Sequence, residues 1–161
     1  DASGFRRPPH VPLLSGGQFA GCLVSPRSAK EYGLAPNGAS TSEIPESLDL
    51  APGELAMADA PERLGEGIYV SRLWYLNYSD RPACRITGMT RFATFWVAGG
   101  EIVAPLNVMR FDDTIYRLLG ANLVDLTAER EFLPSGETYE ARSTSSVRLP
   151  GAVVDGMRFT L

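Results

Sequence analysis

One stretch of the chain, residues 67–111, most constrains the fold, because it holds two long runs of strand-forming residues. In the first run, residues 67–78, apolar side chains occur on both alternating faces, so we expect one face in the core and the other covered or functional. A second run, residues 89–98, has the same pattern and ends at Gly99 and Gly100. Two glycines suit the positive φ angles of a hairpin turn, so the pattern predicts an antiparallel sheet in which the chain turns back at this point.

Shorter elements are predicted around this sheet, each from a local signal. Ser25 followed by Pro26 is typical of a helix start, and Gly33 of a helix end. Asp112 is predicted to cap a further helix, because acidic residues are favoured in a first turn. In chain order the predicted elements are a hairpin over residues 11–24 that turns at Gly16 and Gly17, a helix over 26–32, an exposed loop over 37–49, a helix over 58–64, a helix from Asp112 to its stop at Gly120, a strand over 123–132, a polar loop over 134–146 and a strand over 150–159.

These elements indicate an α+β fold that is mostly β, with antiparallel sheets, β-hairpins and about three short helices. The chain has 161 residues, enough to bury a real core, and its 16 Gly and 12 Pro indicate many turns rather than long helices. We therefore expect residues 1–161 to form a single β-rich domain. The chain opens on Asp1 rather than Met, which suggests a fragment of a longer protein.

Charge and hydropathy argue against two classes of partner. The net charge is −4 and basic residues are dispersed among acidic ones, so the concentrated Lys and Arg field that binds nucleic acid is missing. No apolar run approaches the length of a membrane span, and no signal sequence opens the chain. We expect a cytoplasmic protein that binds neither nucleic acid nor membrane.

Cys22 and Cys84 lack the spacing of a zinc or disulfide motif and are expected to be buried free thiols.

Residues for catalysis or metal binding are scarce in this sequence. His10 is the only histidine, and no HExxH or HExxxH run, nucleophile elbow or phosphate-binding glycine loop occurs. Asp112 and Asp113 could form a carboxylate pair for a metal, but their predicted place in a helical first turn favours capping. The sequence therefore predicts no catalytic residue, no metal ligand and no cofactor within this chain.

Seven aromatic residues lie on the predicted strands, and two interpretations of them stay open. Aromatic residues on strands are most often core. Both faces of these strands are apolar, however, so a groove that stacks a ligand is the alternative, and a free sheet edge would also accept an extended peptide through backbone hydrogen bonds. The seven are Tyr69, Trp74, Tyr75, Tyr78, Phe92, Phe95 and Trp96.

Four segments, taken in order along the chain, resemble one known family. They are LVSPRSAKEYGLAPNGAS from Leu23, GIYVSRLWYLNY from Gly67, TGMTRFATFWVAGGEIVAPLNVMRF from Thr87 and LPGAVVDGMRFT from Leu149. Together they resemble the C-terminal domain of the TldD/PmbA (TldE) family of zinc metallopeptidases, whose members also carry the label modulator of DNA gyrase. The final segment contains no cysteine and has an RFT ending, which is nearer to the PmbA/TldE branch.

The resemblance implies a two-subunit intracellular peptidase associated with unfolded or extended peptides. A TldD-like subunit carries the HExxxH zinc helix and a TldE/PmbA-like partner lacks it, so zinc is expected in the partner or catalytic subunit. The role implied for this chain is scaffold, assembly with a TldD-like subunit or with itself, and peptide guidance. The alternatives are a stand-alone β-sheet module that binds a peptide or small molecule, and a purely structural dimerisation domain.

A set of residues on the central strands is expected to contact the peptide, because these positions mix polar and aromatic side chains. The set is Tyr69, Arg72, Trp74, Thr87, Gly88, Met89, Thr90 and Arg91.

Overall fold

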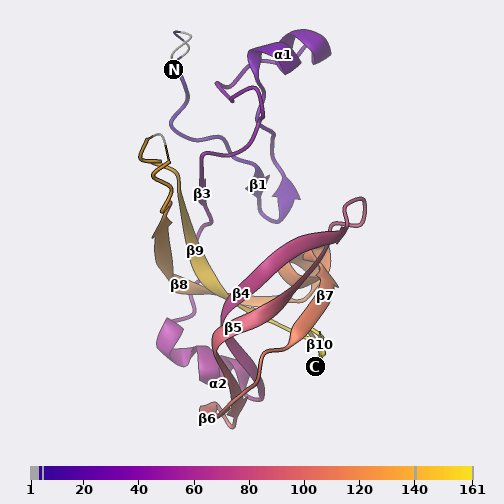
Figure 1. Cartoon of the computed structure of the whole chain (residues 1–161), viewed down its shortest axis with the longest axis vertical. Helices are drawn as coiled ribbons and strands as arrows, with labels where there is room; N and C mark the ends of the chain where they lie inside the picture. The colour runs from indigo at the N-terminus through magenta and orange to yellow at the C-terminus, as the bar shows by residue number, and fades with distance from the viewer. Residues whose placement is uncertain (1–3, 5, 140, 161) are drawn as a thin grey trace. The chain divides into compact units, whose positions relative to one another are not determined.

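The computed structural model describes residues 4, 6–139 and 141–160, and the chain forms two compact units (Figure 1). Unit 1 consists of Asp1–Asp49 and Leu133–Val147, and unit 2 of Leu50–Phe132 and Arg148–Leu161. Strands predominate over helices in the described residues, and the strands of the central sheet pair antiparallel. The predicted α+β, mostly β fold class is therefore confirmed.

Unit 2 is built around the long hairpin of β4 (Gly67–Asp80) and β5 (Arg85–Ala98). After β5 the chain turns at Gly99 and Gly100, whose φ angles are 60° and 82°, into β6 (Glu101–Pro105), as predicted. The sheet order is β10-β7-β5-β4, and β6 also pairs with β5. The two remaining strands of this sheet are β7 (Arg110–Thr114) and β10 (Phe159–Thr160).

The core of unit 2 centres on β7, which lies inside the sheet between β10 and β5. Phe111, on β7, is the largest fully buried side chain and packs edge-on against Phe159, with the ring centroids 6.5 Å apart. Thr90 on β5 is also buried, and its hydroxyl oxygen accepts the backbone N–H of Met109 at 3.1 Å. This hydrogen bond offsets the cost of placing a hydroxyl group in the core.

Unit 1 begins with the predicted hairpin. β1 (Leu14–Ser15) pairs antiparallel with β2 (Gln18–Phe19). The turn residues Gly16 and Gly17 have φ angles of 57° and 74°, values that glycine adopts without steric cost. The prediction is confirmed, although each strand is only two residues long.

The first predicted helix is also confirmed, together with both of its caps. α1 spans Pro26–Tyr32. The side-chain oxygen of Ser25 accepts the N–H of Ser28 at 3.2 Å, which satisfies one of the free donors of the first turn. Gly33 ends the helix in the left-handed conformation, with φ at 67°.

A carboxylate also holds the start of α1, and this makes the stability of unit 1 depend on pH. Glu43 Oε1 accepts the backbone N–H of Ser25 at 2.7 Å. That hydrogen bond, with smaller contributions from the Ser28 and Ser25 hydroxyls, lowers the pKa of Glu43. These hydrogen bonds favour the ionised carboxylate of Glu43 in the folded state. The stability that they contribute is therefore present above the ordinary glutamate pKa, near 4.5, and is lost as the pH falls through the lowered pKa.

We expect the amide of Ser25 to show this loss in hydrogen exchange followed by NMR. At neutral pH its protection factor should be larger in the wild-type chain than in the Glu43→Gln variant. The difference should shrink as the pH falls from about 5 to about 3, because protonation removes the acceptor charge. A difference that stays constant over this range would contradict the assignment.

The segment predicted as an exposed loop, residues 37–49, is more ordered than expected. The side chain of Asn37 accepts the N–H of Val24 at 2.8 Å, which ties the loop to the residues before α1. Its last residues form a short strand, β3 (Ser47–Asp49). The prediction is right for the middle of the segment and wrong for its end.

The remaining elements of the chain match their predictions closely. η1 (Met57–Asp59) leads into α2 (Ala60–Leu64), which ends at Gly65 with φ at 67°. β8 (Leu123–Pro134) covers the predicted strand, and an irregular polar segment separates it from β9 (Ser146–Val154).

The prediction that Asp112 caps a helix is wrong. Asp112 and Asp113 both belong to β7, where they pair with residues of β5. Thr114 takes the capping role instead, since its hydroxyl oxygen accepts the N–H of Arg117 at 3.2 Å. The helical segment η2 (Arg117–Ala121) is a π-helix. Pairing with β5 extends the strand through Thr114, and this moves the helix start down the chain.

Two predicted element ends differ from the structure. Gly120, predicted to end a helix, lies inside η2. The C-cap of η2 is Asn122, and its backbone N–H donates to the carbonyl oxygen of Arg117. The predicted strand over residues 150–159 is divided, because Gly156 has φ at 63° and breaks the extended backbone between β9 and β10. The two parts belong to different sheets.

Candidate binding site on the long hairpin

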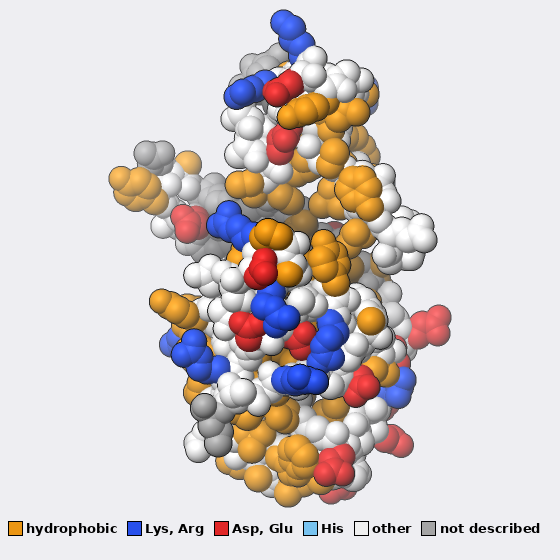
Figure 2. All heavy atoms as spheres, turned by 90° about the vertical axis from the view of Figure 1, so that its right-hand side faces the viewer, with side chains coloured by type: hydrophobic (Ala, Val, Ile, Leu, Met, Phe, Trp, Pro, Cys, Tyr) orange, Lys and Arg blue, Asp and Glu red, His pale blue; other side chains and the backbone are white. Residues whose placement is uncertain are grey.

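The outer edge of β4 is the feature of unit 2 that is best suited to bind another chain. β4 lies at the end of the sheet order and pairs on one side only, with β5, within the described residues. The backbone N–H and C=O groups along its other side therefore have no strand partner there. Large hydrophobic side chains lie at the surface of the molecule among charged ones (Figure 2). On β4 these include Trp74, which is 45% exposed, and Tyr75, which is 75% exposed.

Two β-bulges interrupt the hairpin close to these aromatic side chains. One register shift lies between Val70 and Arg72, and the extra residue is on β5, where Phe92 has φ at 60°. A second lies between Trp74 and Asn77, and there Tyr75 on β4 has φ at 56°. Bulky residues rarely adopt positive φ, and bulges and backbone strain of this kind cluster at binding sites.

An arginine lies between the two bulges. The guanidinium carbon of Arg91 is 4.3 Å from the centre of the Trp74 ring and 5.0 Å from the centre of the Phe92 ring. Such cation–π contacts hold the guanidinium group in a defined plane. Arg72 is the cross-strand partner of Arg91 in the register, so the two arginine side chains lie on the same face of the hairpin. We call Arg72, Trp74, Arg91 and Phe92 the arginine cluster.

The residues predicted from sequence to contact a peptide differ in burial. Thr90 and Gly88 are buried, and half-buried Thr87 donates its hydroxyl to the carbonyl oxygen of Phe111 at 2.9 Å. Tyr69 and Met89 are half-buried. Arg72 and Trp74 are exposed, and Arg91 is half-buried against the Trp74 ring.

The seven aromatic residues also differ in burial. Tyr69, Phe95 and Trp96 are half-buried, while Trp74, Tyr75, Tyr78 and Phe92 are exposed. Sequence reasoning included Tyr75 and Phe92 in the aromatic set but not among the contact residues. The signal that distinguishes them is their positive φ, which no residue pattern of the sequence revealed.

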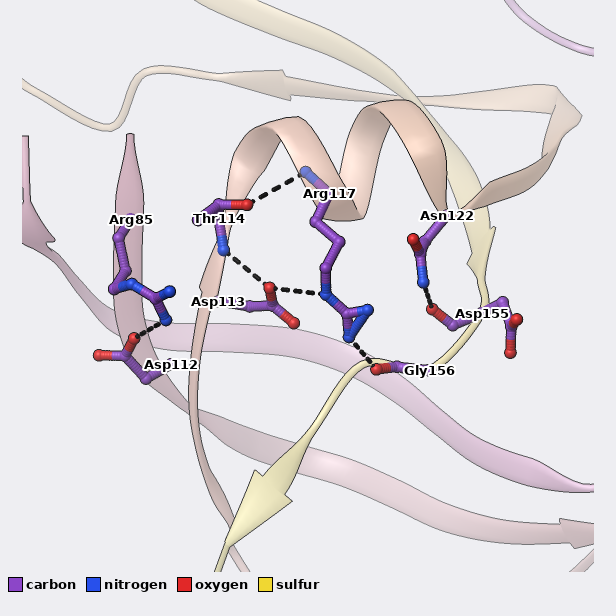
Figure 3. A network of polar contacts seen from close by, with 8 residues as sticks. All are labelled: Arg85, Asp112, Asp113, Thr114, Arg117, Asn122, Asp155 and Gly156. Carbon is purple, nitrogen blue, oxygen red and sulfur yellow. Dashed lines mark hydrogen bonds and ion pairs between the residues drawn. The ribbon is translucent and has the colours of Figure 1, made fainter. Parts of the chain in front are cut away.

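A polar network stabilises the end of the hairpin that lies beside β7 (Figure 3). Arg85 Nη1 donates to Asp112 Oδ1 at 2.9 Å, which raises the pKa of Arg85 and, with a smaller contribution from Ser79, lowers the pKa of Asp112. Asp113 is only 5% exposed, and its Oδ1 accepts the Nε–H of Arg117 at 3.1 Å. Both aspartates thus meet an arginine.

The same network ties η2 to the segment before β10 (Figure 3). The guanidinium group of Arg117 also donates to the carbonyl oxygen of Gly156, and the side-chain amide of Asn122 donates to that of Asp155 at 2.6 Å. These contacts hold the π-helix against the C-terminal segment and have a structural role.

A hollow in unit 1 is a weaker candidate for a site. It has a volume of about 600 Å³, and seven of its fourteen lining residues are serine. The hydroxyls of Ser143 and Ser145 lie 2.7 Å apart and those of Ser40 and Ser42 3.0 Å apart, so each pair shares a hydrogen bond. These bonds use part of the hydrogen-bonding capacity of the lining.

Metal ligands, membrane-spanning helices and cysteines complete the description of possible sites. In the described residues no group of three His, Cys, Asp or Glu side chains could hold a metal ion, and no helix there is long and apolar enough to cross a membrane. Cys22 and Cys84 are free thiols. Cys22 is exposed, so its predicted burial is wrong, because it lies in the irregular segment between β2 and α1.

Comparison with known proteins gives a family match over the whole chain and several structural neighbours. The family model described as PmbA/TldA metallopeptidase C-terminal domain matches residues 1–161. Comparison with curated protein sequences finds no relative.

Among solved structures, a proposed modulator of a DNA gyrase from Thermotoga maritima superposes with a TM-score of 0.75 at 16% identity, covering 92% of this chain and 32% of that one. TldE from Thermococcus kodakarensis gives 0.74 at 17% identity, covering 92% and 33%. A proposed modulator of DNA gyrase from Bacteroides thetaiotaomicron gives 0.65 at 18% identity, covering 92% and 30%. The chain therefore spans about a third of the length of these proteins.

Proposed function

Because this chain belongs to the family of PmbA/TldA metallopeptidase C-terminal domains, we propose that it is the C-terminal domain of a PmbA/TldE-like subunit of a cytoplasmic peptidase. Its role there is to provide scaffold, to associate with a TldD-like subunit or a second copy, and to guide an extended peptide. The family match and the similarity to TldE support the peptidase context. The free edge of β4 beside exposed Trp74 and Tyr75 supports the peptide-guiding role.

The zinc that the family description implies is assigned in this proposal to the catalytic partner subunit. The described residues of this chain do not fit a zinc site: His10 is the only histidine of the sequence, and no three potential ligands gather around it or elsewhere in the described part. Structural and catalytic zinc sites need three or four such ligands. No step of the proposal runs through a metal held by this chain.

The edge of β4 offers a regular stretch on which a peptide can extend the sheet. The bulge at Phe92 places its extra residue on β5, so β4 itself is uninterrupted from Gly67 to Trp74. Each added backbone hydrogen bond contributes about 0.5–1.5 kcal/mol, and Trp74 adds apolar contact area. The bulge at Tyr75 then ends the regular edge, which limits unwanted pairing with other chains.

Selective backbone methylation of a peptide tests this edge. We expect an extended peptide rich in Val and Thr to bind the chain and to change the fluorescence of Trp74. Methylation of alternate backbone nitrogens should weaken binding about tenfold or more in one register, because the methyl groups replace the donors that face β4. Methylation in the other register should have little effect. Equal binding of all three peptides would overturn the proposal.

Self-association is a second candidate function, and the same edge favours it. A second copy could pair its own β4 with this one, because a free edge accepts any extended backbone. Sedimentation of the chain at increasing concentration would show a dimer, and the unmethylated peptide should compete with its formation.

A further inference from the structure

We propose that the β4 edge selects extended peptides that carry an internal acidic side chain, which Arg72 and Arg91 bind together. This inference rests on the proposed peptide-guiding function and names the substrate class of the same site. Three observations carry it: an uncompensated pair of positive charges, the position of the Arg91 guanidinium group, and the antiparallel pairing of the strands in this sheet.

The charge pair is the first observation. Arg72 and Arg91 are direct cross-strand partners, an arrangement in which like charges repel and destabilise a sheet. The described residues supply neither arginine with a carboxylate partner. By contrast, Arg85 and Arg117 in the same unit each meet an aspartate. The hairpin thus places two uncompensated guanidinium groups on one face, where a carboxylate would relieve their repulsion.

The position of Arg91 brings its charge close to the free edge. Its backbone belongs to β5, the inner strand, but its guanidinium carbon lies 4.3 Å from the Trp74 ring on β4. Phe92, turned by its positive φ, contacts the same guanidinium group. Stacking on ring faces leaves the N–H donors at the rim of the guanidinium plane, and this fork fits the two oxygens of a carboxylate.

The direction of pairing distinguishes an internal side chain from a peptide C-terminus. The strands of this sheet pair antiparallel, and antiparallel pairing is the more stable per residue. A peptide that continues the pattern runs opposite to β4, so its C-terminus points toward Gly67 and away from Trp74. A peptide that covers the regular edge from Trp74 to Gly67 runs past Arg72, so the carboxylate beside Arg72 comes from a Glu or Asp side chain within the peptide.

Three matched peptides and three variants test the proposal on the 161-residue chain. The peptides share one Val- and Thr-rich sequence: one has a central Glu and blocked termini, one a central Gln and blocked termini, and one a central Gln and a free C-terminal carboxylate. We expect the Glu peptide to bind about tenfold more tightly than either Gln peptide, as one charge-assisted contact allows. The preference should fall to about twofold or less in Arg72→Gln and in Arg91→Gln. It should persist in Arg81→Gln, which removes the same charge from the turn of the same hairpin.

The outcomes separate this inference from the function on which it rests. If the Glu and Gln peptides bind equally well, acidic selection is overturned while peptide binding at β4 stands. If the free carboxylate substitutes for the Glu side chain, an internal acidic residue is not the ligand. If none of the peptides binds, the peptide-guiding function itself fails. A cooperative thermal unfolding transition in each variant would verify that it is folded. Arg72→Gln should be no less stable than the wild-type chain, because the substitution relieves like-charge repulsion between Arg72 and Arg91.

Discussion

Replacing Gly53 by alanine is expected to destabilise unit 2 by about 3 kcal/mol, at the upper end of the usual cost of overpacking. A Cβ atom at this position would lie 2.1 Å from the carbonyl oxygen of Leu126 and 2.8 Å from its carbonyl carbon. Both are backbone atoms of β8, so the clash cannot be relieved by rotating a side chain. The N–H of Gly53 also donates to the carbonyl oxygen of Thr127 at 3.0 Å, a bond that the displaced chain would lose.

Urea unfolding followed by tryptophan fluorescence measures this effect, since both tryptophans of the chain lie in unit 2. Gly120→Ala is the matched control: a Cβ there meets no atom within 4 Å, and an alanine in a helical segment should be neutral or stabilise by up to about 1 kcal/mol. A Gly53→Ala variant as stable as the wild-type chain would show that Gly53 does not contact β8.

The Phe111→Ala variant is expected to lose about 3–5 kcal/mol of unfolding free energy, which approaches the whole stability of a domain of this size. Phe111 is 2% exposed and packs against Phe159, so truncation removes buried apolar area and leaves a cavity. Phe111 is also the cross-strand partner of Gly88 in the register. A Cβ atom on Gly88 would lie only 2.9 Å from the Phe111 ring. The ring therefore fills the space that the glycine leaves open.

The same truncation at an exposed ring provides the control for Phe111. Phe92 is 68% exposed, and Phe92→Ala should cost less than about 1 kcal/mol because little area is uncovered. Phe111→Leu should fall between the two alanine variants, since it keeps most of the buried volume. A small and equal loss in both alanine variants would place Phe111 outside the core.

Elements with a complete local signal were predictable from residue order. Paired glycines supply two successive positive φ angles, and the two hairpin turns predicted from such pairs, at Gly16-Gly17 and Gly99-Gly100, both occur. The turn between β4 and β5 contains no glycine pair. Ser25 and Gly33 cap α1 with interactions that span only a few residues, so neither depends on distant parts of the chain. The long alternating runs likewise became β4 and β5, because a strand face with that many apolar residues is stable only when it is partly covered.

The candidate site was only partly predictable, for a reason visible at particular residues. Arg72, Trp74 and Arg91 were selected from strand pattern, yet Thr90 and Gly88, one and three residues before Arg91, are buried. A bulge changes which side chains share a face, and its position depends on how β4 and β5 align. The contribution of Phe92 follows from that alignment and not from its neighbours in the sequence.

Local chemistry thus determined where this chain turns, where α1 begins and ends, and which residues form its longest strands, because those interactions close within a few residues. Long-range pairing decided the rest. Asp112 became a strand residue because it pairs with Thr87 of β5, and Gly53 lies in van der Waals contact with β8 although more than seventy residues separate them in the chain. The arginine cluster, too, depends on the alignment of β4 and β5, because this register makes Arg72 and Arg91 cross-strand partners. The alternation of residues along each strand does not by itself fix that register.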